Sequence, residues 1–360
     1  MRKKTLILIC LLLVPFAVWS FAAANEEDPL ASLSYLTGAF TDLVEKKVDQ
    51  RLDESDGELL SQIEETGGIS ANIASTWLEK RMKREDILKG ATGTGVLLLA
   101  GGMKVTYGSG AVVDVTAGTV AESGAALVPQ HRYLVAEDTA ADFTVTSPTA
   151  VIDYQGSYTF RDSAAPDYNA MARALRGLHM FRGTTIGYGE GFELEQPATR
   201  IQALIMFIRV LGEENEALAW TGSTPFTDVL DWAKPYVGYA YEKGYTNGCS
   251  PTQFLPDMAA TAQQYTEFVL RAMGYSSTAN TDLSDTLVRA LGSGVLTEGE
   301  CQALGSLDAF RRSELVYISY YALHAALPEG DTLAARLQEK GVFTSEEWRS
   351  ARELVTTQRL

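Results

Sequence analysis

The chain reads FTDVLDWAKPYVGYAYEKGYTNG from Phe226 to Gly248, and this stretch organises the C-terminal half of its 360 residues. Apolar side chains recur at helical spacing between Trp232 and Tyr241, which predicts a helix there. A loop follows, and then a second amphipathic helix is expected over residues 260–273. The predicted unit is therefore a helix, a glycine-rich loop and a helix.

This unit recurs on both sides of itself. An offset of 50 residues superimposes Ala240, Gly244, Phe254 and Gln264 on Ala290, Gly294, Leu304 and Glu314. An offset of 62 residues in the other direction superimposes Phe254, Thr261, Phe268, Arg271 and Gly274 on Phe192, Thr199, Met206, Arg209 and Gly212. We place three copies at residues 161–213, 226–275 and 282–327. One copy cannot bury its long apolar helix alone, so three packed copies with a shared core are expected.

The repeat resembles the S-layer homology (SLH) repeat of bacterial surface proteins over nearly half of the chain. The middle copy carries most of that pattern: Phe226, Asp228, Val229, Trp232, Gly244, Asn247, Gly248, Phe254 and Pro256. Copy one keeps the family's helix start at Thr199 and Arg200, and copy three keeps a degenerate form of it at residues 311–314. Copy two departs from the pattern, because Ala262 stands where the family has Arg.

The resemblance implies a C-terminal all-α bundle of three SLH-like repeats over residues 161–327, with binding grooves between adjacent repeats. It also implies non-covalent attachment to the bacterial cell wall. The implied partner is a secondary cell-wall polysaccharide, a peptidoglycan-linked polymer that often carries pyruvate ketals. We therefore expect a secreted, non-catalytic protein of the cell wall or S-layer, with no cofactor and no metal.

A pyruvate ketal presents a carboxylate, and a guanidinium can donate two parallel hydrogen bonds to it. Arg200 and Arg312 stand at the signature Arg position in the first helical turn, where unpaired N–H groups would also favour an anion. The expected polysaccharide-binding set is Arg200, Arg312, Asp228, Trp232, Gly248 and Glu314. Structural ion pairs for the two arginines, core packing for Trp232 and a helix N-cap role for Asp228 remain open alternatives. Because Ala262 lacks a guanidinium, one or two working grooves are expected.

The N-terminal half differs in pattern, so the whole chain is predicted to be a multidomain α+β protein. Residues 25–90 are expected to be helical, because Leu36, Phe40 and Leu43 and then Ile69, Ile73 and Trp77 form apolar stripes. This segment either packs on its neighbour or forms a stalk that joins copies of the chain into a homo-oligomer. Residues 91–160 are expected to form a small all-β domain, with Gly101 and Gly102 as a two-residue hairpin turn. Residues 328–360 are expected to form a helical pair.

Residues 1–24 are typical of a secretory signal peptide, with Arg2, Lys3 and Lys4 before an apolar run and three alanines at its end. An uncleaved membrane anchor is the alternative; after cleavage no membrane segment is expected. The formal net charge is −16 and the pI is near 4.7. Such a chain repels nucleic-acid phosphates and anionic lipid, so neither is expected as a partner.

Three histidines and three cysteines leave little material for a metal site or a catalytic dyad. We therefore expect no enzyme. Two alternatives to a wall-anchored protein remain. One is a protein-interaction module built on degenerate repeats, which the eroded third copy favours, and the other is a cell-wall glycan-acting enzyme. Cys249 and Cys301 occupy loops of neighbouring copies, where either a disulfide or two free thiols are compatible with export.

Overall fold

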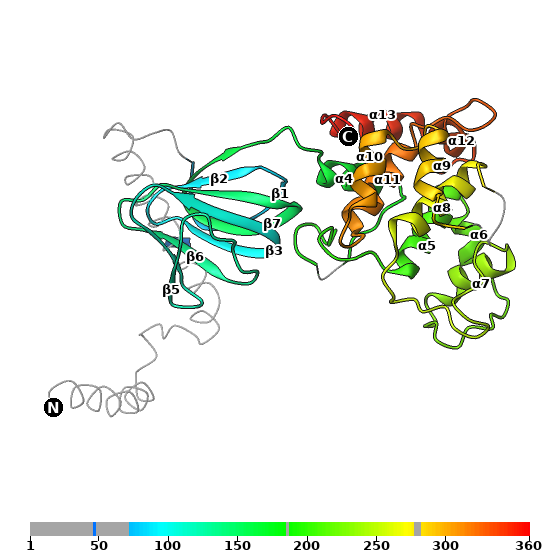
Figure 1. Ribbon diagram of the computed structural model, residues 1–360, viewed down its shortest axis with the longest axis horizontal. Coiled ribbons are helices and arrows are strands. Elements are labelled where there is room, and N and C mark those ends of the chain that lie inside the picture. Colours follow the sequence, from blue (N-terminus) through cyan, green and yellow to red (C-terminus); the bar gives the residue numbers. More distant parts are fainter. Residues whose placement is uncertain (1–45, 48–71, 185–186, 277–281) are drawn as a thin grey trace, which may run out of the picture. The chain divides into compact units, whose positions relative to one another are not determined.

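The computed structural model describes residues 46–47, 72–184, 187–276 and 282–360. The expected signal peptide and the stripes of residues 36–43 lie outside the described residues, as does the proposed oligomerising stalk up to residue 71. Residues 71–360 form one compact unit, in which a sheet adjoins a set of helices (Figure 1). The predicted mixture of α and β structure is confirmed.

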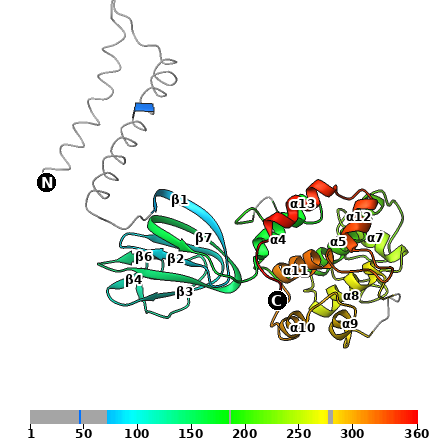
Figure 2. The same cartoon turned by 90° about the horizontal axis from the view of Figure 1, so that it is seen from above.

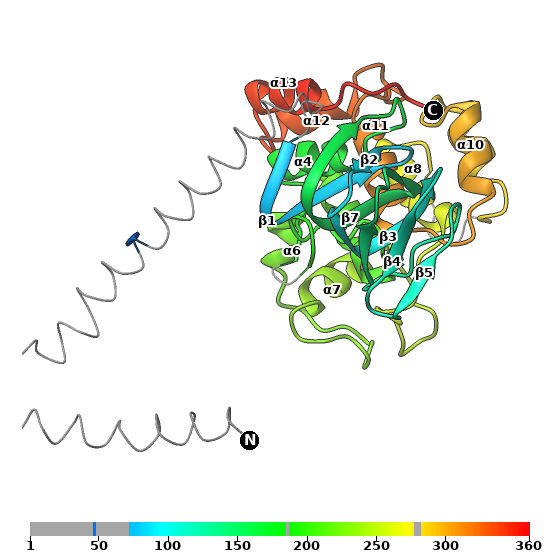
Figure 3. The ribbon, with the colours of Figure 1, turned by 90° about the vertical axis from the view of Figure 1, so that its left-hand side faces the viewer.

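The sheet has seven strands in the order β1-β7-β3-β6-β4-β5, with β2 parallel to β7 and all other pairs antiparallel (Figure 3). The strands are β1 (Asn72–Lys83), β2 (Ile87–Gly90), β3 (Gly95–Tyr107), β4 (Ala111–Asp114), β5 (Thr119–Ala121), β6 (Arg132–Ala136) and β7 (Ala141–Arg161). Along the start of β7, Ala141, Phe143 and Val145 are buried and alternate with less buried polar residues. This two-residue period is typical of a strand with one apolar face.

The predicted helix over residues 72–90 is wrong, because β1 and β2 occupy that stretch. β1 pairs with β7 from Asn72 opposite Tyr158 to Lys83 opposite Thr149. The four-residue spacing of Ile73 and Trp77 suggested a helix face, but residues four apart also share a face in a strand. The spacing of apolar residues therefore fits a helix and a strand equally well. Residues 72–83 form a strand because their backbone pairs with β7.

The predicted hairpin at Gly101 and Gly102 is also wrong, since β3 continues through both residues. The pairing with β7 shifts register on either side of Gly101, which is a β-bulge. Gly101 has φ +86°, and a Cβ there would lie 2.4 Å from the Thr149 carbonyl oxygen. Gly101 therefore allows the backbones of β3 and β7 to approach closely, and the chain does not reverse direction there.

Ten helices follow among the described residues (Figures 1 and 2). They are α4 (Tyr168–Gly177), α5 (Arg200–Leu211), α6 (Glu214–Leu218), α7 (Lys234–Glu242), α8 (Ala262–Met273), α9 (Thr286–Gly292), α10 (Glu298–Gly305), α11 (Arg312–Ala322), α12 (Leu333–Glu339) and α13 (Ser345–Leu354). α7 and α8 lie close to the two helices that apolar periodicity predicts around residues 232–241 and 260–273. Their buried side chains form one apolar core.

Helices α5, α8 and α11 pack against one another at the centre of this core (Figure 2). α5 and α8 each begin with a reciprocal capping box, closed by Gln202 and Gln264, whereas at α11 only Glu314 contributes, by accepting the Arg311 amide. The segments before the helices also pair, because the amide of Ala198 donates to Phe310 O and that of Ala260 donates to Ala198 O. Three stretches far apart in sequence therefore converge at one point.

Candidate functional site

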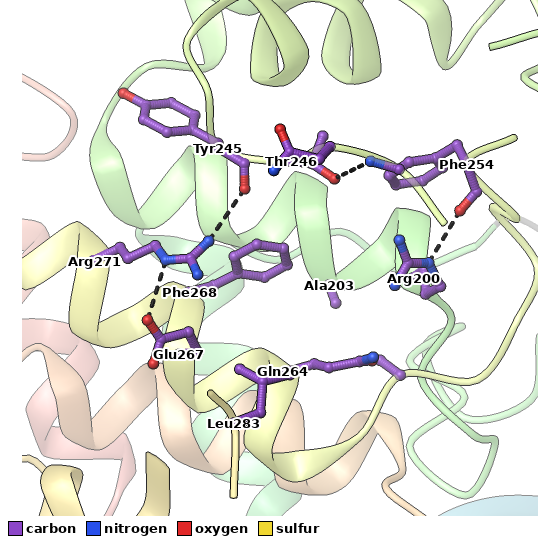
Figure 4. Close-up of a pocket in the computed structure, with 13 residues that line it drawn as sticks. Arg200, Ala203, Tyr245, Thr246, Phe254, Gln264, Glu267, Phe268, Arg271 and Leu283 are labelled. Atoms are coloured by element: carbon purple, nitrogen blue, oxygen red, sulfur yellow. Dashed lines mark hydrogen bonds and ion pairs between the residues drawn. The ribbon is translucent and has the colours of Figure 1, made fainter. Parts of the chain in front are cut away.

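A pocket of about 250 Å³ lies between the start of α5, the loop after α7 and one face of α8 (Figure 4). We call it the Arg200 pocket. Arg200 lies at one end of it and Arg271 at the other, with the Phe268 ring between them. Of the six predicted binding residues, this pocket brings together only Arg200 and Gly248.

Arg200 is held by its neighbours through one nitrogen. Its Nε donates to Phe254 O at 3.1 Å, and the guanidinium carbon lies 5.1 Å from the centre of the Phe254 ring. Among the described residues Arg200 forms no ion pair, whereas Arg209 and Arg271 each pair with a glutamate. The guanidinium is half-buried, and its charge helps to lower the pKa of Asp228, but the two groups form no salt bridge.

The start of α5 does not supply free N–H groups, contrary to the expectation from sequence. The amide of Arg200 donates to Met258 O at 2.8 Å and that of Ile201 donates to Pro256 O at 3.0 Å. The Gln202 amide donates to the capping hydroxyl of Thr199. The first turn of α5 therefore has no free N–H group for an anion, and the Arg200 side chain is its contribution to the pocket.

The far end of the pocket is a buried ion network that the sequence did not reveal. Glu267 is 1% exposed and accepts from Arg271 Nε at 3.2 Å and from an Arg289 terminal nitrogen at 2.7 Å. Arg271 also donates to Tyr245 O at 3.3 Å. In the sequence, the only sign of this network was that Arg271 matches Arg209 at an offset of 62 residues, and both arginines pair with a glutamate. Arg289 is also paired with Asp285 at 2.9 Å, so this network is balanced in charge, and the positive charge of the pocket lining comes from Arg200.

Asp228 braces the loop that presents Phe254. Its two carboxylate oxygens accept the amides of Phe254 at 2.9 Å and Leu255 at 2.8 Å. Burial acts to raise the pKa of Asp228, but these two hydrogen bonds lower it below its ordinary value overall. The N-cap role is wrong, because α7 begins at Lys234 after Ala233.

Gly248 lies in a tightly packed loop, whereas Trp232 is largely exposed to solvent. Gly248 has φ +72°, and a Cβ there would lie 2.3 Å from the Phe226 ring, so only glycine allows this loop to close. Trp232 is 59% exposed and does not line the Arg200 pocket. The core-packing alternative for Trp232 is therefore wrong.

Arg312 repeats the contact of Arg200 in a closed setting. Its Nε donates to Phe192 O at 2.9 Å, just as Arg200 donates to Phe254 O 62 residues further on. Arg312 is only 6% exposed, and its guanidinium carbon lies 5.1 Å from the centre of the Phe181 ring. Burial lowers the pKa of Arg312. Unlike Arg200, Arg312 does not line the Arg200 pocket.

Glu314 closes the cap of α11 by accepting the Arg311 amide at 2.8 Å, and it is 5% exposed. Cys249 and Cys301 are both free thiols in this structure. The Cys249 Sγ lies 3.6 Å from Phe254 O, and Cys301 is partly buried in α10.

In the described part of the chain, no helix combines the length and the apolar character needed to cross a bilayer.

Comparisons with known proteins give limited matches. No family model matches the sequence. A curated protein named "Cell surface protein" from Thermoanaerobacter kivui is 32% identical over 146 residues, which are 39% of this chain and 17% of that protein. The chain therefore spans a small part of the length of that relative.

Two solved structures show low similarity. A dTDP-6-deoxy-D-glucose-3,5-epimerase from Legionella pneumophila Philadelphia 1, solved with dTDP-4-keto-L-rhamnose, is 20% identical and covers 29% of this chain and 56% of its own, with a TM-score of 0.17. Procruciferin, an 11S globulin from Brassica napus, is 12% identical over 28% of this chain and 27% of its own, also with a TM-score of 0.17. Scores this low support no inference about the fold or activity of this chain.

Proposed function

We propose that this chain is a non-catalytic cell-surface protein that is held to the bacterial cell wall by its helical region. The name of the Thermoanaerobacter kivui relative supports a location at the cell surface. The threefold SLH-like arrangement is part of this proposal, and the offsets of 62 and 50 residues between the capped starts of α5, α8 and α11 support it.

The Arg200 pocket is the proposed binding site for a carboxylate-bearing saccharide of the wall. The single observation that carries this assignment is the Arg200 guanidinium, which lines the pocket and forms no salt bridge among the described residues. Its terminal nitrogens suit a planar carboxylate such as that of a pyruvate ketal. The Phe268 ring offers an apolar surface for the face of a sugar ring.

We propose one such pocket per chain. Ala262 supplies no guanidinium at the position equivalent to Arg200, and it is 5% exposed. Arg312 has the guanidinium, but it lies beneath Phe181 and is 6% exposed. A single charged contact contributes about 1.5–3 kcal/mol, so retention on a wall would draw on several contacts within this pocket.

The test is co-sedimentation of the chain with purified wall sacculi, native or stripped of pyruvyl groups. We expect pelleting on native walls, a loss of at least tenfold in Arg200→Ala, and little pelleting on stripped walls. Arg349→Ala is the matched control, because this arginine is 62% exposed on α13 and its removal changes the net charge equally. Equal pelleting of Arg200→Ala and Arg349→Ala would contradict the assignment.

A protein-interaction module is the second candidate, because apolar side chains gather on two loops that Asp228 joins. Leu230 and Trp232 are 64% and 59% exposed, and Leu255 on the neighbouring loop is 36% exposed. Trp232→Ala should then weaken pelleting on native and stripped walls alike. If only Arg200→Ala weakens it, the interaction module is excluded as the mode of attachment.

A further inference from the structure

A second cleft lies between the sheet and the start of α11, away from the Arg200 pocket. It consists of two adjoining pockets of about 600 and 510 Å³, and Ser147, Pro148 and Arg311 line both. We call it the sheet–helix cleft. Each volume is within the range of about 300–1,000 Å³ that small-ligand sites occupy.

The ionic groups of this cleft are largely paired. Glu195 pairs with Arg81 at 2.5 Å, Glu300 pairs with Arg359 at 2.5 Å, and Arg311 pairs with Asp308 at 3.0 Å. The two remaining charged residues of the lining, Arg84 and Glu314, are opposite in sign. The lining is therefore close to neutral, so neither an anion nor a cation has a clear electrostatic advantage there.

Uncharged hydrogen-bonding groups are instead abundant in the lining. The Ser313 hydroxyl in the 510 Å³ pocket is fully buried and meets no group in hydrogen-bond geometry among the described residues, although it helps to lower the pKa of the neighbouring Glu314. The exposed Gln196 side chain borders the same pocket. A buried hydroxyl without a partner is costly, so a ligand that hydrogen-bonds to Ser313 would gain from satisfying it.

Aromatic rings line the other end of the cleft. Tyr168 and Tyr317 both border the 600 Å³ pocket, with ring centres 5.5 Å apart. Tyr317 is 3% exposed and its hydroxyl donates to Glu300 at 2.8 Å, so the partly exposed Tyr168 is the ring that can face a sugar. Leu304 and Leu307 add further apolar surface beside them.

We propose that the sheet–helix cleft binds an uncharged, hydroxyl-rich saccharide. A neutral lining, the buried Ser313 hydroxyl and the partly exposed Tyr168 ring favour such a ligand over a charged one. The inference is independent of the Arg200 pocket, since the two sites share no lining residue. The chain would then contact wall glycan at two chemically different places.

Saturation-transfer NMR on the full chain tests this proposal with two neutral probes, N-acetylglucosamine tetramer and maltotetraose. We expect transfer to at least one of them, and a loss of at least tenfold in affinity when Gln196→Trp or Ser306→Trp fills either end of the cleft. Gln302→Trp is the matched control, because this exposed residue of α10 lies outside the lining. Ser313→Ala should weaken binding several-fold, and Arg200→Ala should leave it unchanged.

Three results would overturn the assignment. The first is the absence of transfer from both neutral probes to a wild-type chain with normal circular dichroism. The second is unchanged transfer in both tryptophan variants. The third is full displacement of a neutral probe by a simple carboxylate such as pyruvate, which would identify the cleft as an anion site.

Discussion

Arg200 and Arg312 show how the same local contact leads to different roles. Each is the first residue of its helix and donates Nε to the carbonyl of a phenylalanine from another loop. Arg200 is left half-buried at a pocket, whereas Phe181 covers Arg312. We therefore expect Arg200 to act in binding and Arg312 to act in stability.

Glu314 provides a prediction about pH at the level of one side chain. Burial raises the pKa of this carboxyl above its ordinary value of 4.5, although the Arg311 amide donates to it. The charged form is then disfavoured in the folded chain. The contribution of Glu314 to the free energy of unfolding is therefore greatest below about pH 4.5 and falls as the pH rises through the folded pKa. Glu314→Gln, which keeps an acceptor for the Arg311 amide, should abolish this loss.

Urea denaturation between pH 4 and pH 8 checks the prediction. The free energy of unfolding of Glu314→Gln should exceed that of wild type at pH 7, and the difference should shrink towards pH 4. Glu339→Gln, a change at an exposed position on α12, should leave the pH profile as it is. A constant difference between Glu314→Gln and wild type across the range would contradict the assignment.

The elements of the chain differ in how far local sequence determines them. The capped starts of α5 and α8 follow from Thr199 and Thr261 with a glutamine three residues on, and both helices end at a glycine in the left-handed region. These signals involve near neighbours in sequence, so they are readable without the fold. β1 carries no equivalent signal, and its identity depends on a partner strand about 70 residues away.

The bulge in β3 yields a prediction at this scale. Gly101→Ala places a methyl group 2.4 Å from the Thr149 carbonyl oxygen at a φ of +86°. We expect a decrease of about 2 kcal/mol or more in the free energy of unfolding, because strain and overpacking add. Gly108→Ala meets no atom within 4 Å and should cost less than about 1 kcal/mol. Equal urea midpoints for the two variants would refute the role given to Gly101.

At the scale of the whole described unit, one arginine joins the sheet to the helical region. Arg81 of β1 donates Nε to Asn169 of α4 at 2.8 Å, and its terminal nitrogens bond Gly189 O at 3.0 Å and Glu195 at 2.5 Å. The side chains of Arg81 and Glu195 are 4% and 7% exposed. The ion pair is therefore held away from water between two parts of different secondary structure.

Removal of this arginine should weaken the whole unit. Arg81→Ala leaves Glu195 buried without its cation, which we expect to cost about 3–5 kcal/mol in the free energy of unfolding. Scanning calorimetry should show a lower midpoint and a broader transition as the sheet and helices become less cooperative. The double variant Arg81→Met with Glu195→Gln should recover most of the loss. A midpoint within 1 °C of wild type for Arg81→Ala would show that the sheet and helices do not depend on this pair.

The sequence by itself determined the mixed α and β composition, the capped helices α5, α8 and α11 and the position of Arg200 in a first helical turn. It did so because capping, turns and apolar periodicity act within a few residues. Gly248 was likewise identified from its loop pattern, and its positive φ agrees with that reading.

Only the tertiary structure decided which guanidinium stays accessible, that residues 72–83 form a strand, and that Asp228 braces a loop. Arg312 is closed off by Phe181 and Phe192, which lie more than a hundred residues earlier in the chain. Solvent exposure and strand pairing depend on groups brought together by folding, and their distance in sequence hides them from any local pattern.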